Sequence, residues 1–250
     1  MSARGLYRAA PLVDRGFLLA LAVLAVLGAA ALASPVDETL LDPAITLPAA
    51  YERFCGLGLA TCVFLPLYAL GVSGEMSRLG HPASLVRGPS RQAATLRCAV
   101  ALVARGVVFE AVQLAFGLAA AFVKAGTTFA PPDVAIFAAQ QLVLGTLWFA
   151  AAGMAMLAGR LVWGWGVLAI VPALLYAGYE VLLSLAPLPL VSEEFQMGWL
   201  LVLSADPADP PASLPGAARL ATLVLILLLL CLRLSRRADF LEGGAEDVGT

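Results

Sequence analysis

Two carboxylates lie inside the most apolar parts of this chain, where ionisable side chains are costly. Glu110 falls near the middle of the apolar stretch 98–123, and Glu180 falls in the later part of the stretch 161–185. A charged group deep in a bilayer costs a few kcal/mol unless it is protonated, hydrated or paired. Such groups commonly line a substrate or ion path, or they hold helices together.

Each carboxylate belongs to a stripe of small and polar residues that recurs every three or four positions. Residues at this spacing share one face of a helix, and small residues let membrane helices approach closely. Both faces are therefore predicted to contact protein or water rather than lipid. Two interpretations stay open: tight helix packing with hydrogen-bonded carboxyls, or the polar lining of a path or subunit interface. The stripes are Gly106, Glu110, Gln113, Gly117 and Ala120, then Gly166, Ala169, Ala173, Ala177, Glu180 and Ser184.

Three further polar side chains fall within apolar stretches. Gln140 and Gln141 are adjacent, so on a helix they point about 100° apart and at most one can join any single interface. Arg105 is expected to extend its guanidinium to the cytoplasmic surface, which makes 106–123 the true membrane span.

The residue types needed for most catalytic chemistry are scarce. The single histidine, His81, excludes bis-histidine haem ligation, a His-rich zinc site and most Ser–His chemistry in the membrane. No P-loop pattern occurs, so the chain is not expected to hydrolyse ATP itself. We predict no catalytic residue, cofactor or metal ligand. The cysteines form no C-x-x-C pair and are expected to be small buried hydrophobes: Cys55, Cys62, Cys98 and Cys231.

The composition indicates the class of protein in which these polar side chains are positioned. Residues of the set AVILMFWYC make up 61% of the 250 residues, and 13% are charged. A typical soluble domain is about 45–50% apolar and about 25% charged. The excess of apolar residues cannot be explained by a larger hydrophobic core, because a soluble chain of this size needs a polar surface. A soluble globular enzyme and a disordered chain are therefore excluded.

Six stretches approach the length of about 20 apolar residues that a helix needs to cross a bilayer. We expect an all-α, polytopic membrane protein with one transmembrane domain over residues 1–250. Pro66 and Pro172 should kink the second and fifth spans. The predicted spans are 16–33, 54–72, 98–123, 134–157, 161–185 and 217–234.

Basic residues gather on one side of this topology. The positive-inside rule places that side, with both termini, on the cytoplasmic side of the cell (inner or plasma) membrane. The arginines on it are Arg4, Arg8, Arg15, Arg78, Arg87, Arg91, Arg97, Arg160, Arg233, Arg236 and Arg237. The opposite side carries most of the acids and only Arg53, Lys124 and Arg219.

The first span could also be a cleaved signal peptide, because A-L-A-S at 31–34 resembles a cleavage site. Its apolar run of about 18 residues is longer than the usual signal core of about 7–15 residues. We therefore expect the first span to be retained in the mature protein. Mass spectrometry of the mature N-terminus would show whether it is cleaved.

Three segments do not fit as spans. Residues 3–15 form either an interfacial helix or an ordinary flanking tail. The cytoplasmic insert 74–97 contains a candidate helix over 81–87, a break, and Ser90 as the N-cap of a helix that continues into the third span. The insert is either a docking site for a cytoplasmic partner or a loop that anchors topology.

The third such segment, 186–216, lies on the external side. Its apolar part, 195–205, is about 11 residues long and too short to cross a bilayer. Its ends would leave backbone groups unpaired in hydrocarbon. We expect a re-entrant or interfacial helical element between the fifth and sixth helices.

This order of elements resembles the membrane subunits of ABC-2 type ABC transporters. The run Leu85-Val86-Arg87-Gly88-Pro89-Ser90-Arg91 is similar to the pattern L-hydrophobic-R-x-x-S-R that precedes their third span, and 234–240 looks like their basic exit from the last helix. The resemblance implies that a separate ABC ATPase docks on the insert. It also implies that a second permease copy, or a related permease, helps to enclose a path. The coupling residues would be Leu85, Arg87, Ser90 and Arg91.

The leading hypothesis is therefore a permease subunit of an ABC-type exporter of a hydrophobic or peptide-like substrate. Glu110, Gln113 and Glu180 are the candidate intramembrane path or interface. Membrane lipids are expected partners, and nucleic acid is not. Two alternatives stay open: a non-catalytic assembly subunit of a larger membrane complex, and a membrane enzyme that acts on lipids through the two carboxylates. Against the lipid-enzyme alternative, the sequence contains no D-D-x-x-D-type cluster of carboxylates.

Overall fold

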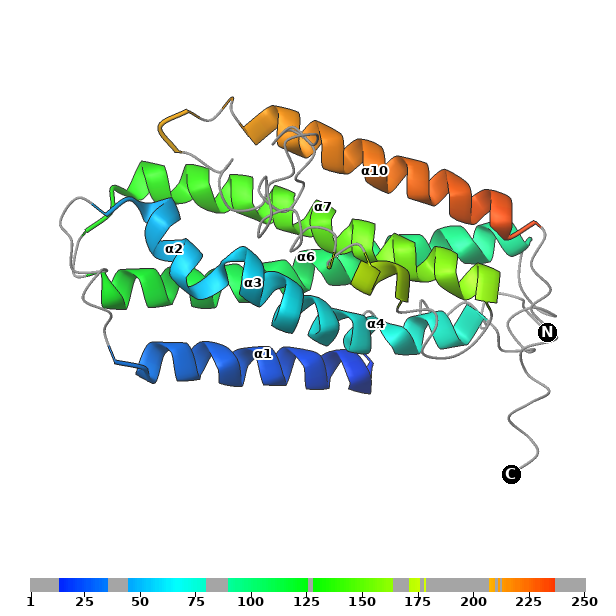
Figure 1. Cartoon of the computed structure of the whole chain (residues 1–250), viewed down its shortest axis with the longest axis horizontal. Helices are drawn as coiled ribbons and strands as arrows, with labels where there is room; N and C mark the ends of the chain where they lie inside the picture. Colours follow the sequence, from blue (N-terminus) through cyan, green and yellow to red (C-terminus); the bar gives the residue numbers. More distant parts are fainter. Residues whose placement is uncertain are drawn as a thin grey trace, which may run out of the picture.

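The computed structural model describes residues 14–35, 45–79, 90–125, 128–163, 171–175, 178, 207–209, 211 and 213–236. Every element in these ranges is a helix, which confirms the all-α class. The helices run roughly along one axis and form an elongated bundle (Figure 1). Helices α6 and α7 pack together at its centre, with α1 against α4 and α6, and α10 against α7.

Four helices are long and apolar enough to cross a membrane. They are α1 (Arg15–Ala33), α6 (Arg91–Lys124), α7 (Pro131–Trp163) and α10 (Ser213–Leu234). A bent pair, Leu47–Cys55 with Ala60–Met76, adds a fifth if it counts as one span. These helices are compatible with a multi-pass membrane protein, which confirms that part of the expectation. The remaining spans and the side on which the termini lie stay predictions.

The second predicted span, 54–72, is not one straight helix. It consists of α2 (Leu47–Cys55), the short α3 (Leu57–Leu59), the π-helical turn η3 (Ala60–Phe64) and α4 (Leu65–Leu79). Its two halves are bent by 40° at the break between Cys55 and Ala60. Gly56 ends α2 in an extended conformation, and a Cβ atom there would lie 2.6 Å from the Glu52 carbonyl oxygen. This bend at Gly56 was not predicted from the sequence, and the kink expected at Pro66 stays a prediction.

The π-helical turn explains why Pro66 is tolerated in this segment. Proline has no backbone N–H and its ring clashes with the carbonyl four residues earlier in a regular α-helix. Just before Pro66, the Leu65 N–H donates to the Ala60 carbonyl, one residue further back than in an α-helix. We infer that this wider turn accommodates the ring, so that α4 continues to Leu79.

Helix α6 begins where the sequence predicts and is longer than the predicted span. Ser90 is its N-cap residue, as expected, and the helix continues unbroken for 34 residues to Lys124. Residues 91–97 of the predicted insert 74–97 are therefore the first part of this helix. Residues 80–89, with the candidate helix over 81–87, lie outside the described residues.

Helix α7 corrects the predicted boundary between the fourth and fifth spans. The predicted fourth span ends at residue 157 and is followed by a short connection with Arg160, but α7 continues through Trp163 and buries Arg160. The prediction was wrong because no strong helix breaker stands there. A single glycine, Gly159, costs a helix only about 1 kcal/mol.

Much of the last third of the predicted topology lies outside the described residues. The predicted fifth span, 161–185, is described only at its start, at 171–175, where it is helical, and at 178. Nearly all of 186–216 is also outside. The last helix, α10, begins at Ser213, four residues before the predicted start. Pro215 is compatible with this earlier start, because proline is tolerated in a first helical turn.

A cluster of aromatic rings joins α4, α6 and α7 in the core. Tyr68 and Phe109 each lie 5.0 Å, centroid to centroid, from the Phe149 ring. Trp148 lies 5.1 Å from the same ring. The buried Tyr68 hydroxyl donates a 2.9 Å hydrogen bond to the Leu102 carbonyl oxygen. This bond fixes α4 against α6.

Replacing Tyr68 with phenylalanine should lower the free energy of unfolding by about 1 kcal/mol, because one buried hydrogen bond is lost while the ring packing remains. Unfolding in mixed detergent micelles, followed by circular dichroism, measures the change. Thr222→Val is the control, because the exposed Thr222 hydroxyl bonds only within its own helix. Equal stability of both variants and the wild type would contradict the placement of the Tyr68 bond.

Candidate functional site

Arg105 joins three helices through a buried cluster of charges, here called the ion-pair cluster: Asp14, Glu75 and Arg105. One guanidinium nitrogen, Nη2, lies 3.0 Å from the Asp14 carboxylate and 3.1 Å from the Glu75 carboxylate. Nη1 donates to the Gly71 carbonyl oxygen over 3.4 Å, and the Phe17 ring centroid lies 5.4 Å from the guanidinium carbon. Arg105 is 0% exposed. The expectation that it extends to the surface was therefore wrong, because two carboxylates neutralise it inside the bundle.

The start of α1 supplies one of these carboxylates. Asp14 is the N-cap of α1, and its Oδ1 accepts a 2.9 Å hydrogen bond from the Phe17 N–H. Its other oxygen pairs with Arg105. Glycines of α4 make this close approach possible, since a Cβ atom at Gly74 would lie 3.0 Å from the Asp14 carboxylate. Asp14 thus both caps a helix and neutralises Arg105.

A second group of buried polar side chains, here called the polar cluster, lies deeper in the bundle. Glu110 is 0% exposed and faces the amide of Gln141 on α7. Gln113, one turn further along α6, lies beside the phenol of Tyr51 and the thiol of Cys55 on α2, although the Tyr51 hydroxyl has no partner of good hydrogen-bond geometry among the described residues. The polar cluster therefore joins α2, α6 and α7.

The acceptor oxygens of the polar cluster are not satisfied by the described residues. Both carboxylate oxygens of Glu110, and Oε1 of Gln113 and of Gln141, lack a partner with good hydrogen-bond geometry there. Each buried acceptor without a donor costs about 1–3 kcal/mol. The cluster is therefore suited to accept hydrogen bonds from a water molecule, a ligand or a polar substrate group.

The stripe on α6 faces the protein interior, as predicted. All five of its residues are buried. Gly106 and Glu110 pack against α7, and Gly117 packs against Tyr51 and Cys55 of α2. This burial agrees with the packing of α6 against α2 and α7, but the Glu110 carboxyl has no partner of good hydrogen-bond geometry among the described residues, so both interpretations of the stripe stay open. Of the second stripe only Ala173 is described, and it is buried; Glu180 lies outside.

The two adjacent glutamines of α7 contact different helices, which confirms their predicted divergence. Gln141 is buried beside Glu110 of α6. The Gln140 amide donates a 3.3 Å hydrogen bond to the Ser213 hydroxyl at the start of α10. The pair therefore holds α7 against two neighbours at once.

The candidate coupling residues are described only in part. Ser90 and Arg91 are exposed at the first turn of α6, whereas Leu85 and Arg87 lie outside the described residues. Gln92, next along α6, lies beside Leu232 and Arg236 at the end of α10. The predicted coupling end of α6 is therefore adjacent to the last helix of the bundle.

The sequence analysis did not identify Tyr51 or Cys55 as polar-cluster residues. A signal for their helix was present: Pro48 after Thr46 is typical of a helix start, and Leu47, Ala50 and Tyr51 follow helical spacing. Three cysteines are buried as expected, but Cys62 is exposed. Asp14 and Glu75 were missed because no pattern in the sequence links them to Arg105.

Lys124 marks the other end of α1. Its buried ammonium group donates to the carbonyl of Ser34, the C-cap of α1. A cation there also complements the helix dipole. The ion-pair cluster and Lys124 are therefore separated by the length of α1, 19 residues or about 28 Å, close to the thickness of a bilayer core of about 30 Å.

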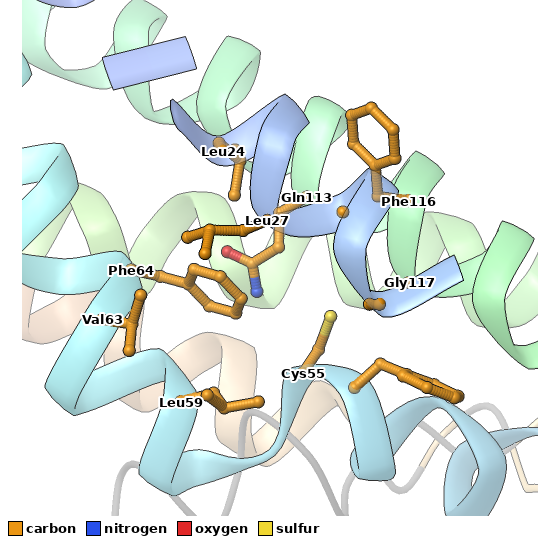
Figure 2. A pocket seen from close by; sticks show the side chains of 12 residues that line it. Leu24, Leu27, Cys55, Leu59, Val63, Phe64, Gln113, Phe116 and Gly117 are labelled. Atoms are coloured by element: carbon orange, nitrogen blue, oxygen red, sulfur yellow. The ribbon is translucent and has the colours of Figure 1, made fainter. Parts of the chain in front are cut away.

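A cavity of about 230 Å³ lies beside the polar cluster, between α1, the α2–η3 segment and α6 (Figure 2). Gln113 and Cys55 belong both to its wall and to the polar cluster. The other lining residues are apolar side chains or glycines: Leu24, Leu27, Gly28, Ala31, Phe54, Leu59, Val63, Phe64, Phe116 and Gly117. The cavity therefore places one amide in largely apolar surroundings.

Within the described ranges, no group of three His, Cys, Asp or Glu side chains could hold a metal ion. Comparisons of the chain with protein families, curated proteins and solved structures found no match. The ion-pair cluster, the polar cluster and the cavity are the features from which a function can be inferred.

Proposed function

We propose that this chain is the membrane subunit of an ABC-type exporter. ATP binding and hydrolysis on a separate ATPase then drive the movement of a hydrophobic or peptide-like substrate. The observation that carries the proposal is the continuity of α6. One unbroken helix links Ser90 and Arg91, at the candidate coupling end, to Glu110 and Gln113 in the polar cluster.

A continuous helix transmits displacement along its length. The 34 residues of α6 span about 50 Å at 1.5 Å per residue. Arg105 lies about 20 Å from Arg91 by the same rise, and there the ion-pair cluster attaches α6 to α1 and α4. A push on the first turns of α6 would therefore act against this attachment and move the polar cluster on its far side.

The proposal requires the rest of the predicted topology. The chain crosses the cell membrane six times with both termini in the cytoplasm, and the segment 186–216 caps the external side. Residues 80–89, between α4 and α6, contact the ATPase through Leu85 and Arg87. Glu180 joins Glu110 and Gln113 along the path, which is completed by a second permease copy or a related permease.

Reversing the charge at Arg87 and Arg91 together should lower the amount of co-purifying ATPase about tenfold. Charged contacts at an interface rim set its association rate and partner choice. The tagged full-length chain is purified from its native membranes in mild detergent, and Mg-ATP hydrolysis in the eluate is measured. Arg53→Glu is the matched control, because Arg53 is exposed on α2, outside the candidate coupling segment.

Two outcomes would contradict the transporter proposal. The first is a wild-type eluate without ATPase. The second is an equal loss of ATPase for the double reversal and for Arg53→Glu. Membrane insertion and yield of each variant are compared first, so that a folding defect is not counted as lost coupling.

A further inference from the structure

The cavity between α1, α2–η3 and α6 has an accessible side and a buried side. Leu27 and Leu59, which line it, are 39% and 42% exposed, whereas Cys55 and Gln113 are 5% and 2% exposed. A molecule would therefore enter between Leu27 and Leu59 and reach Gln113 at the inner end. If these helices cross the membrane as proposed, the exposed side faces lipid, and entry is from the bilayer.

The inner end of the cavity presents a hydrogen-bond acceptor without a donor. The Gln113 amide lies among the lining side chains in Figure 2, with its nitrogen nearer to Cys55 than its oxygen. Tyr51 and Cys55 lie beside this amide, and the Tyr51 hydroxyl also lacks a partner of good hydrogen-bond geometry among the described residues. The Oε1 atom of Gln113 is buried and lacks a partner among the described residues. A donor on a bound molecule would satisfy it.

The size and the lining of the cavity restrict what can fill it. At about 230 Å³ it is larger than the cavity of about 150 Å³ that binds benzene in an engineered protein. A water molecule needs two to four polar partners, and the lining offers only the Gln113 amide and the weakly polar Cys55 thiol. The rings of Phe54, Phe64 and Phe116 favour an apolar or aromatic body.

We propose that this cavity is a binding site for a small, membrane-soluble apolar molecule that carries one hydrogen-bond donor. The apolar body fills the space between the phenylalanine rings, and the donor bonds to Oε1 of Gln113. The site does not depend on the transport proposal, because it is formed by this chain alone. A chain that binds no ATPase would still bind the molecule, so failures of the two proposals can be told apart.

A pair of probes of nearly the same shape tests the donor directly. 5-Fluoroindole has an N–H donor, and 5-fluorobenzofuran has an oxygen in its place. Fluorine NMR follows their binding to the full-length chain in nanodiscs of phosphatidylcholine and phosphatidylglycerol, with empty nanodiscs as the blank. We expect saturable binding of the indole, and binding of the benzofuran weaker by about tenfold, the upper range for one buried hydrogen bond.

Three variants locate the site. Gln113→Leu should weaken the indole about tenfold and leave the benzofuran unchanged, because only the acceptor is lost. Ala31→Phe should abolish binding of both probes, because Ala31 lines the cavity. Ala30→Phe is the matched control: Ala30 is exposed on the same helix and absent from the lining, so binding should be unchanged.

Several results would overturn the proposal. They are the absence of saturable indole binding above the blank, equal affinity of the two probes for the wild-type chain, and equal effects of Ala31→Phe and Ala30→Phe. The comparison of the two probes uses the wild-type chain and stands even if Gln113→Leu does not fold.

Discussion

Replacing Arg105 with methionine should lower the free energy of unfolding by about 3–5 kcal/mol, the cost of breaking a buried ion pair by removing one partner. Arg105 is fully buried, and its loss leaves the carboxylates of Asp14 and Glu75 inside the bundle without their cation. Unfolding of the purified chain in mixed detergent micelles, followed by circular dichroism, measures the change.

The control for this substitution is Arg97→Met on the same helix. Arg97 is exposed, so its removal should cost less than about 1 kcal/mol. Neutralising the partners provides the second test. The triple variant Arg105→Met, Asp14→Asn and Glu75→Gln should be more stable than Arg105→Met alone, because no unpaired carboxylate remains. If Arg105→Met is no worse than Arg97→Met, the ion-pair cluster does not stabilise the bundle.

Adding one methyl group at Gly145 should destabilise the bundle by about 1–3 kcal/mol, the usual cost of overpacking a core. A Cβ atom there would overlap the Glu110 carboxyl group, which lies directly against the α7 backbone at this glycine. Either α6 and α7 must separate or Glu110 must change its rotamer. The melting temperature in detergent of Gly145→Ala, compared with the wild type, reports the loss.

A double-mutant cycle identifies the contact. In a Glu110→Ala background the side chain that meets the new methyl group is absent, so Gly145→Ala should then cost much less. Gly106→Ala is the control at the same helix pair, because the nearest atom to its Cβ would be the Thr146 carbonyl oxygen at 3.5 Å, an ordinary contact. An unchanged cost of Gly145→Ala in the Glu110→Ala background would contradict the placement of Glu110 against α7.

The features predicted correctly from the sequence are those that depend on helical periodicity. The buried face of α6 follows from residues spaced three and four apart, because that spacing defines a helix face. The divergence of Gln140 and Gln141 follows from the 100° between adjacent residues. Ser90 as the start of α6 follows from the preference for serine at N-cap positions and from the preceding proline, although its side chain makes no capping hydrogen bond.

The features missed depend on partners distant in the sequence or on weak local signals. Arg105 resembles an arginine at a membrane boundary until its neighbours are known, and Asp14 is 91 residues away from it. The fourth predicted span ends at residue 157 and leaves Arg160 in a short connection, although no clear helix breaker stands there. The bend at Gly56 could not be predicted because a single glycine is only a weak helix breaker.

The ion-pair cluster also bears on how the chain enters the membrane during synthesis. Asp14 precedes Arg105 by 91 residues and Glu75 precedes it by 30, so both carboxylates leave the ribosome before the helix that needs them. An arginine within a crossing helix is costly to insert unless it is paired. Carboxylates already held by α1 and α4 offset that cost as α6 arrives. If α1, α4 and α6 cross the membrane as proposed, the counter-ions are synthesised before the charge that they neutralise, and the insertion of α6 is expected to depend on the earlier insertion of α1 and α4.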